Sequence, residues 1–223
     1  MKGHDLQGAY TADRASALSG VPKSTIHYWD RTQLLVPSIS PERIKLWSYP
    51  DLMGLRTIYW LRREKTADDG ISIPATSMPT VRRALRGLRD LDLALWTEEL
   101  GPSVAVDRSG HIYFDAAGQV STLTGQRPLN RDLLDLIAPF ETEVGVAPNL
   151  YAPRPSLRIV PGKLSGSPHI VKTRIETVAI AALEERGLTE AKIAKLYPMA
   201  PPVAIGEALD LEHQLQTHLR SAA

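Results

Sequence analysis

The chain has 223 residues, 43% of them hydrophobic, which excludes a compositionally disordered protein and suffices for two small domains or one large one. It has no cysteine, which excludes a disulfide scaffold and thiolate metal sites. The net charge is only +1, but residues 1–95 carry 14 Lys/Arg against 10 Asp/Glu, whereas residues 96–223 carry 12 against 15. Nucleic acid is therefore expected to meet the first part and a different partner the second.

The first predicted elements are two short helices joined by a tight turn. Thr11 is a suitable N-cap, and apolar residues at helical spacing follow it until Gly20 ends the helix. Pro22 then opens a second helix that runs to Arg31, because a missing N–H costs nothing at the first helical position. Inside this helix Ile26 and Trp29 are expected to turn inward. A short helix, a glycine turn and a second helix with a polar face form the layout of a helix-turn-helix.

The polar face of the second helix carries hydrogen-bond donors and cations of the kind that meet phosphates and base edges in the major groove. A wing after this helix adds two more cations. The predicted DNA-binding residues are Lys23, Ser24, Thr25, His27, Tyr28, Arg31, Arg43 and Lys45.

These residues resemble the MerR-type winged helix-turn-helix, which implies a DNA-binding function. The resemblance rests on Thr25–Asp30, Leu34–Leu35, Pro37 and Arg43–Ser48, and it continues through helices expected at Tyr49–Glu64 and Ser77–Asp92. The family has an arginine where this chain has His27, so His27 is expected to be a weaker phosphate anchor, because imidazole is mostly neutral at pH 7. It also has tyrosines in place of Trp29 and Trp47. Metal-sensing members rely on cysteine, so metal sensing of that kind is not expected here.

The middle of the chain predicts a small antiparallel meander. Asp68–Pro74 interrupts the helical pattern as an exposed loop, and from Gly101 the apolar period becomes two. Three strands are predicted, at Val104–Val106, His111–Phe114 and Gln119–Leu123, with turns that end in Gly110 and Gly118. A helix at Asn130–Phe140 is expected to cover the meander. Pro148–Pro155 is proline-rich and is predicted to be a linker or an extended arm.

The last part predicts a strand pair followed by three helices. The strands are expected at Leu157–Val160 and His169–Val171. Thr173–Glu176 has the pattern of a capping box that opens a helix running to Arg186 and ending at Gly187. Thr189 caps a second helix that ends before Tyr197, and a third helix is expected from about Pro202 to Leu219. This order resembles a second helix-turn-helix-like unit.

Residues 157–212 also resemble a small domain of unknown function that occurs in bacterial VapB-type antitoxins. The partners of that family are VapC-type toxins, which are PIN-fold ribonucleases. The resemblance is carried by Ile159–Val160, Gly166–Ile170, Thr173–Ile175, Gly187–Ile193 and Tyr197–Pro198. The family has a longer, glycine-richer first turn, and it has a glycine where this chain has Lys172.

The third helix of this unit is not expected to read DNA. It carries Glu207, Asp210 and Glu212 and has no Lys or Arg from Leu196 through Leu219, so phosphates would repel it. Its apolar residues exceed one core-facing stripe, which favours a protein-contact or dimerisation surface. The alternative is that they complete the core of the domain. These residues are Val203, Ile205, Leu209, Leu211 and Leu215.

No catalytic motif stands out, so an enzyme is not expected. The chain has no Gly-x-Ser-x-Gly elbow, His-Glu-x-x-His motif or Walker sequence. His213 and His218 would point to different helix faces, so neither a metal nor another cofactor is predicted. The N-terminus lacks the apolar region of a secretory signal, and no apolar run reaches the roughly 20 residues of a membrane span.

The sequence thus predicts a mainly α protein with small β elements, divided into a winged helix-turn-helix (residues 1–97), a connecting meander with a helix (98–150) and a three-helix, helix-turn-helix-like domain (151–223). The predicted function is that of a cytoplasmic, homodimeric antitoxin that binds operator DNA and neutralises a PIN-domain ribonuclease. Arg154 and Arg158, on an arm with few internal contacts, and Arg220 are the candidate toxin contacts. The alternative is a one-component MerR-like regulator whose meander binds a small effector.

Overall fold

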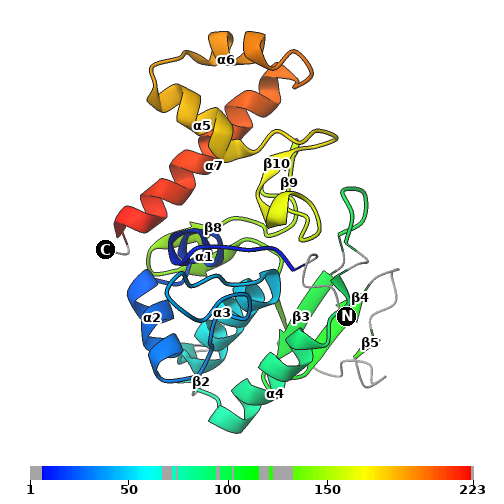
Figure 1. Cartoon of the computed structure of the whole chain (residues 1–223). Coiled ribbons are helices and arrows are strands. Elements are labelled where there is room, and N and C mark those ends of the chain that lie inside the picture. Colours follow the sequence, from blue (N-terminus) through cyan, green and yellow to red (C-terminus); the bar gives the residue numbers. More distant parts are fainter. Residues whose placement is uncertain are drawn as a thin grey trace.

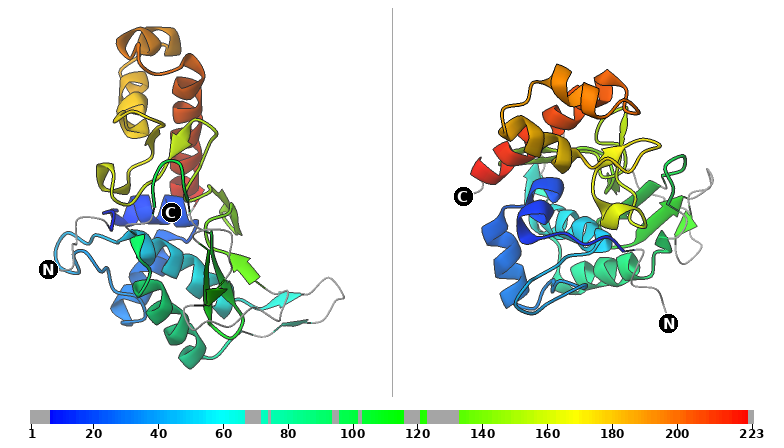
Figure 2. Two further views of the ribbon diagram at one scale, coloured as in Figure 1. Left: turned by 90° about the vertical axis from the view of Figure 1, so that its right-hand side faces the viewer. Right: turned by 45° about the horizontal axis from the view of Figure 1, so that its top comes forward.

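The structure is a computed structural model of the whole chain (Figure 1). The residues that it describes are 7–66, 72–73, 75–93, 96–101, 103–115, 121–122 and 133–221. Helices α5–α7 form a lobe at the top of Figure 1, whereas α2 and α4 lie at the bottom, and the side view of Figure 2 keeps this arrangement. The predicted fold class, mainly α with small antiparallel β elements, is confirmed.

The two N-terminal helices form as the sequence predicts. Helix α1 spans Ala12–Ser19, and its N-cap Thr11 accepts a hydrogen bond from the backbone N–H of Arg14. Gly20 ends the helix with φ of 77°, a left-handed conformation that glycine adopts without a steric penalty. Helix α2 spans Lys23–Arg31. It buries Ile26 and Trp29, as predicted, and so keeps its polar side outward.

The wing and the third helix follow directly. The wing folds back through isolated antiparallel bridges, Ser40 to Leu46 and Tyr10 to Trp47. Helix α3, Tyr49–Arg62, begins with a capping box between Ser48 and Asp51 and is buried along most of its length. The wing therefore leads directly into α3, the most deeply buried helix of the N-terminal region.

A short hairpin and a fourth helix complete the N-terminal region. Strands β1 (Lys65–Thr66) and β2 (Ser72–Ile73) pair antiparallel, so the loop predicted at residues 68–74 contains a strand; residues 68–71 and 74 lie outside the described residues. Helix α4, Met78–Arg89, packs on α3 through a buried stripe. The stripe consists of Val81, Ala84, Leu85 and Leu88.

The predicted meander exists and gains a fourth strand. Strands β3 (Ser103–Asp107), β4 (Ile112–Asp115), β5 (Ser121–Thr122) and β6 (Leu133–Asp135) form an antiparallel sheet in the order β5-β4-β3-β6. The first turn ends in Gly110 with φ of 78°, as predicted. Of the second turn, residues 116–118 lie outside the described residues.

The helix predicted at Asn130–Phe140 is wrong over its described part, residues 133–140. Leu133–Asp135 is strand β6 at the edge of the sheet, and Phe140 begins β7 (Phe140–Thr142), which pairs with β8 (Gly145–Ala147). The Asp135 carboxylate accepts hydrogen bonds from the N–H groups of Ile137 and Ala138, a local turn that competes with a helix. The helix that packs beside the sheet is α4, which ties to the first turn through a hydrogen bond from Arg83 to the carbonyl of Ser109.

The proline-rich segment 148–155 is not a free linker. Leu150 is fully buried, and the Tyr151 hydroxyl donates to the carbonyl of Glu98. Arg154 pairs with Asp210 at 2.7 Å and donates to Gln214. The segment is packed because its apolar side chains join the core and its polar groups bond to helix α7.

The C-terminal lobe has the predicted order of elements. Strands β9 (Leu157–Arg158) and β10 (His169–Ile170) pair antiparallel around the 3₁₀ turn η3 (Leu164–Gly166). Helices α5 (Thr177–Glu185), α6 (Glu190–Leu196) and α7 (Pro202–Ser221) follow.

The capping box predicted at Thr173–Glu176 is wrong. Helix α5 begins only at Thr177, and its N-cap Glu176 makes no side-chain capping bond. The Thr173 hydroxyl instead bonds the carbonyl of Ile170 and the N–H of Ile175, which closes a turn before the helix.

Helix α7 is an internal helix rather than a free surface. Of the five apolar residues thought to exceed one core stripe, Ile205, Leu209, Leu211 and Leu215 are buried, and only Val203 is exposed. The alternative, that these residues complete the core, therefore holds for four of them. Helix α7 packs on α5 and also on α1 of the N-terminal region.

One continuous apolar core connects the regions, from Leu18 of α1 through Phe140 of β7 to Leu215 of α7. The division of the chain near residues 97 and 150 stays a prediction. Contacts of α1 with both α7 and β8 cross these boundaries.

Candidate nucleic-acid interface

The outer side of α2 presents the polar residues that the sequence predicted for DNA binding. Ser24, Tyr28 and Arg31 are exposed, and Lys23, Thr25 and His27 are half-buried. Tyr28 exposes 56% of its surface, so both its ring and its hydroxyl can be reached by a binding partner. Ile26 and Trp29 anchor the opposite side, so the orientation of this face is fixed by the core.

His27 sits against the wing. Its ring meets the buried Trp47 edge-to-face, with 6.4 Å between the ring centroids and an interplanar angle of 70°. This contact ties α2 to the base of the wing. The half-buried His27 ring therefore contributes to packing, and only its exposed part is available to contact DNA.

Two of the predicted DNA-binding cations are engaged within the protein. Lys23 pairs with Asp13 at 2.6 Å on the surface of the two helices. Lys45 pairs with Asp30, whose side chain is only 5% exposed. The wing cation therefore compensates a buried carboxylate of α2, and the free positive charge of this surface is smaller than predicted.

Arg43 remains as an exposed cation of the wing, next to Ile44, which is 69% exposed. The base of the wing is held by Asp51, whose carboxylate accepts hydrogen bonds from the backbone and hydroxyl of Ser38. Burial raises the pKa of Asp51, and the bonds from Ser38 and Ser48 oppose that rise. The wing is thus fixed at its base and exposed at its tip.

Comparison with known families accords with this geometry. Residues 10–72 match the family model of the MerR HTH family regulatory protein. The N-terminal region is a MerR-type helix-turn-helix. Residues 158–210 match the model of a protein of unknown function, DUF433. No curated protein and no solved structure gives a significant match to the chain.

Both resemblances seen in the sequence are therefore confirmed, and the MerR-type region identifies a DNA-binding regulator. The matched C-terminal domain has no known function. The individual DNA-binding residues stay a prediction.

The MerR-type region is fastened to the rest of the chain by a buried arginine, which the sequence analysis missed. Arg56 of α3 is fully buried and donates to the backbone carbonyls of Leu18, Leu136, Ala138 and Pro148, at 2.6–3.0 Å. Burial lowers its pKa to about 9, so the guanidinium stays charged at neutral pH. Its five N–H donors suit a site made of several carbonyls.

A second fastening joins the MerR-type region to the DUF433 region. Arg14 of α1 forms a bidentate ion pair with Glu212 of α7, with distances of 2.6 and 2.7 Å. The Thr177 hydroxyl at the start of α5 also donates to Glu212, whose side chain is only 6% exposed. Glu212, read from the sequence as a charge that repels phosphates, is thus a buried structural group.

Glu98 forms the third fastening, between the segment that follows helix α4 and the β9–β10 hairpin. Its carboxylate accepts from Lys163, from the Nε2 of the buried His169 at 2.8 Å and from the N–H of Lys172. Burial alone would raise the pKa of Glu98, but these hydrogen bonds outweigh it and hold the pKa below its ordinary value.

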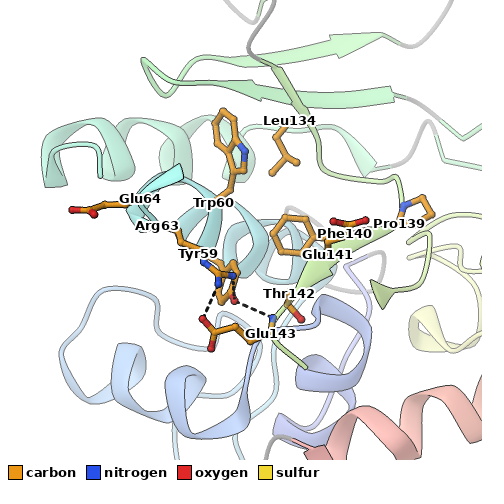
Figure 3. Close-up of a pocket in the computed structure, with 10 residues that line it drawn as sticks. All are labelled: Tyr59, Trp60, Arg63, Glu64, Leu134, Pro139, Phe140, Glu141, Thr142 and Glu143. Carbon is orange, nitrogen blue, oxygen red and sulfur yellow. Dashed lines mark hydrogen bonds and ion pairs between the residues drawn. The ribbon is translucent and has the colours of Figure 1, made fainter. Parts of the chain in front are cut away.

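A pocket of about 470 Å³ lies between the end of α3 and strand β7 (Figure 3). Tyr59 and Phe140 meet edge-to-face in its wall, 5.8 Å between centroids. Arg63 crosses the Tyr59 ring, bonds the Tyr59 hydroxyl and pairs with Glu143 at 2.8 Å. The pocket combines aromatic walls with charged groups at its rim, a composition suited to a small ligand.

In the part of the chain that the structure describes, no group of three or more His, Cys, Asp or Glu side chains is arranged to hold a metal ion. His213 bonds Glu184 and the buried His218 faces the carbonyl of Ala17, so these two side chains lie apart. Among the described helices, none has the length and apolarity that crossing a membrane requires.

Proposed function

We propose that this protein is an antitoxin that represses its own operon. Its MerR-type region binds operator DNA through α2 and the wing, and its C-terminal region holds a PIN-domain ribonuclease encoded beside it. Such a role implies a cytoplasmic protein. The observation that carries the proposal is the combination, in one chain, of a MerR-type helix-turn-helix with a DUF433-type domain of the kind the sequence resembles in VapB-type antitoxins.

The C-terminal lobe supports a protein partner more than a second DNA contact. Helix α7 carries Glu207, which accepts a hydrogen bond from the backbone N–H of Ser156, and Asp210, which pairs with Arg154, and it offers no Lys or Arg before its last turn to bind phosphates. The tip of the lobe, at the turn between α6 and α7, exposes Leu196, Met199 and Val203 at 57%, 83% and 62%. Exposed apolar side chains gathered in one place favour protein association.

The three arginines proposed as toxin contacts differ in how far their side chains are bonded within the protein. Arg154 is held by Asp210 and Gln214, and Arg158 donates to the carbonyls of Glu98, Pro155 and Leu157. The expectation that an arm with few internal contacts carries them is therefore wrong. Arg220, exposed in the last turn of α7, is the strongest of the three as a cation for the carboxylates of a ribonuclease.

The test is co-expression with the protein of the adjacent reading frame, followed by co-purification and an RNA-cleavage assay. We expect a stable complex without ribonuclease activity. Changing Arg220 to Ala should restore cleavage more than changing Arg154 or Arg158. Absence of a complex, or a complex that still cleaves RNA, contradicts the antitoxin function.

We further propose that the protein binds a palindromic operator as a homodimer, because one recognition helix reads too few base pairs for specificity. Deleting residues 150–223 is not a suitable test of this, since it would remove the hydrogen-bond partners of two N-terminal side chains, Glu212 for Arg14 and the carbonyl of Leu150 for Tyr49. Sedimentation equilibrium of the full chain, alone and with operator DNA, tests the dimer directly. A monomer under both conditions contradicts it.

A second candidate function is a one-component regulator that responds to a small effector, and the pocket between α3 and β7 favours it. The pocket adjoins the end of α3, so a bound ligand would touch the hairpin that leads to α4. A thermal-shift screen of the full chain with small aromatic and charged compounds tests this candidate. A compound that supports this candidate should raise the melting temperature of the wild type, lose that effect in Tyr59→Ala and change the affinity of the wild type for DNA. A compound that stabilises the protein without both other effects argues against the effector function.

A further inference from the structure

The positive charge of the N-terminal region is concentrated on one helix. Residues 1–95 have an excess of four positive charges. Helix α4 carries four arginines and no acidic residue, so the rest of this region is neutral on balance. These arginines are Arg82, Arg83, Arg86 and Arg89.

The four arginines share one exposed side of α4. Their spacing of three to four residues places them on the side opposite the buried stripe at Val81 and Leu88. Arg82, Arg86 and Arg89 follow one line along the helix, which rises roughly 1.5 Å per residue, so the line is roughly 10 Å long. We call these three residues the α4 stripe.

The charges of the stripe are not paired with any acidic side chain that the structure describes. Across the described residues, none of the three arginines has an ion-pair partner, whereas the neighbouring Arg83 bonds the carbonyl of Ser109. The contrast with the predicted DNA surface is direct, because Lys23 and Lys45 there are paired with Asp13 and Asp30. The stripe therefore carries more free positive charge than α2 itself.

Position also favours contact with the same DNA. Figures 1 and 2 place α2 and α4 on the side of the molecule that faces away from helices α5–α7. The three cations lie roughly 5 Å apart along the helix and successive phosphates of one strand about 3.4 Å apart along the duplex axis, so the long arginine side chains can each reach a phosphate without an exact match in spacing. Arginine presents several N–H donors to a phosphate, which makes such contacts strong.

We propose that the α4 stripe is a phosphate-binding surface that extends the DNA interface beyond the helix-turn-helix and its wing. The stripe contributes affinity that is independent of base sequence, while α2 contributes the readout of bases. This inference rests on the proposed DNA-binding function and adds a site to it. The phosphates that the stripe binds are those of duplex DNA.

The test measures how the affinity of the full chain for DNA depends on salt. The probes are the duplex upstream of its own gene and a random duplex of equal length. The variant is R82A/R86A/R89A, and the matched control is R186A/K192A/K195A, which removes three exposed cations from the opposite lobe. A third variant, R82K/R86K/R89K, keeps the charge. Circular dichroism melting checks that all variants fold.

We expect the plot of log affinity against log salt to become less steep by about 2 to 3 units per protomer in the alanine variant, on both duplexes. The control and the lysine variant should keep the slope of the wild type. An unchanged slope in the alanine variant overturns the inference, and so does an equal change of slope in the control variant. If the wild type binds neither duplex, the DNA-binding function itself fails, which is a separate result.

Discussion

The two helix-turn-helix-like regions of this protein differ in what surrounds the last helix of each unit, α2 in the N-terminal region and α7 in the C-terminal region. Helix α2 has nine residues and turns Ser24, Tyr28 and Arg31 to solvent. Helix α7 has 20 residues and buries Glu212 and His218 against other parts of the chain. The last helix thus yields a DNA-facing surface in one region and an internal support in the other.

The difference shows that charge alone does not identify the role of a helix. The acidic residues of α7 exclude DNA, but Glu212 has the further task of holding α1 through Arg14. On α2 the basic residues suit DNA, yet Lys23 is already paired with Asp13. The role of each charge depends on whether a partner from a distant segment reaches it.

The largest effect is expected at Arg56, which joins α3 to the end of α1 and to the backbone of residues 136–148. Arg56→Leu should lower the free energy of unfolding by at least about 3 kcal/mol, because it leaves several buried carbonyls without a donor. Urea unfolding of the full chain measures it. Arg56→Lys, which keeps the charge but has fewer donors, should lie in between. A leucine variant as stable as the wild type would contradict the fastening role.

The next effect tests whether α7 is an internal support. Glu212→Ala should cost about 3 kcal/mol, since it leaves Arg14 without its buried carboxylate partner. Asp210→Ala on the same helix is the matched control. Its side chain is 70% exposed, so its pair with Arg154 should contribute less than about 1 kcal/mol. Equal losses in the two variants, or no coupling between Glu212 and Arg14 in a double-mutant cycle, would contradict the support role.

A third prediction concerns the pH dependence of the hydrogen bonds that Glu98 accepts from the β9–β10 hairpin. The pKa of Glu98 lies below its ordinary value of 4.5 in the folded protein, so its contribution is fully present above that value and is lost as the pH falls through the folded pKa. Glu98→Gln should therefore be less stable than the wild type by about 2 kcal/mol at pH 7. The difference should shrink as the pH falls below 4.5. A difference that stays constant down to pH 3 would argue against the carboxylate.

The smallest effects separate the two cations of the wing. Arg43→Ala should reduce the salt slope of DNA binding by about 0.9 per protomer and leave stability unchanged, because Arg43 is exposed. Lys45→Ala should instead cost about 1 kcal/mol of stability, because the buried Asp30 loses its partner. DNA titrations and urea unfolding of both variants decide this. The reverse pattern would restore Lys45 as a primary DNA contact.

Much of the N-terminal region could be predicted because its signals are local. The Thr11 cap, the Gly20 stop and the inward Ile26 and Trp29 each act within a few residues of the elements they define. The same holds for the meander, whose alternating pattern and Gly110 turn are read directly from the chain. The two segments that match known families, residues 10–72 and 158–210, are likewise contiguous stretches of the chain.

Predictions failed where a local pattern competed with a distant partner. The apolar side chains from Leu133 to Phe140 have helical spacing, but residues 133–135 pair with the edge of β3 as strand β6. The proline-rich segment around Arg154 suggested an arm, but Asp210 and Gln214 of α7 hold it in place. In both cases hydrogen bonds to a remote element outweigh the local tendency.

Caps, turns and periodicity are properties of neighbouring residues, so the kind of elements, their order and the polar face of α2 follow from the amino-acid sequence. Which charges remain free depends on how the chain folds in three dimensions. Arg14 and Glu212 lie 198 residues apart and Arg56 bonds carbonyls as far as 92 residues away, so no local pattern announces them. A buried charge must find its partner wherever the fold brings one, and that choice sets which cations are left for DNA.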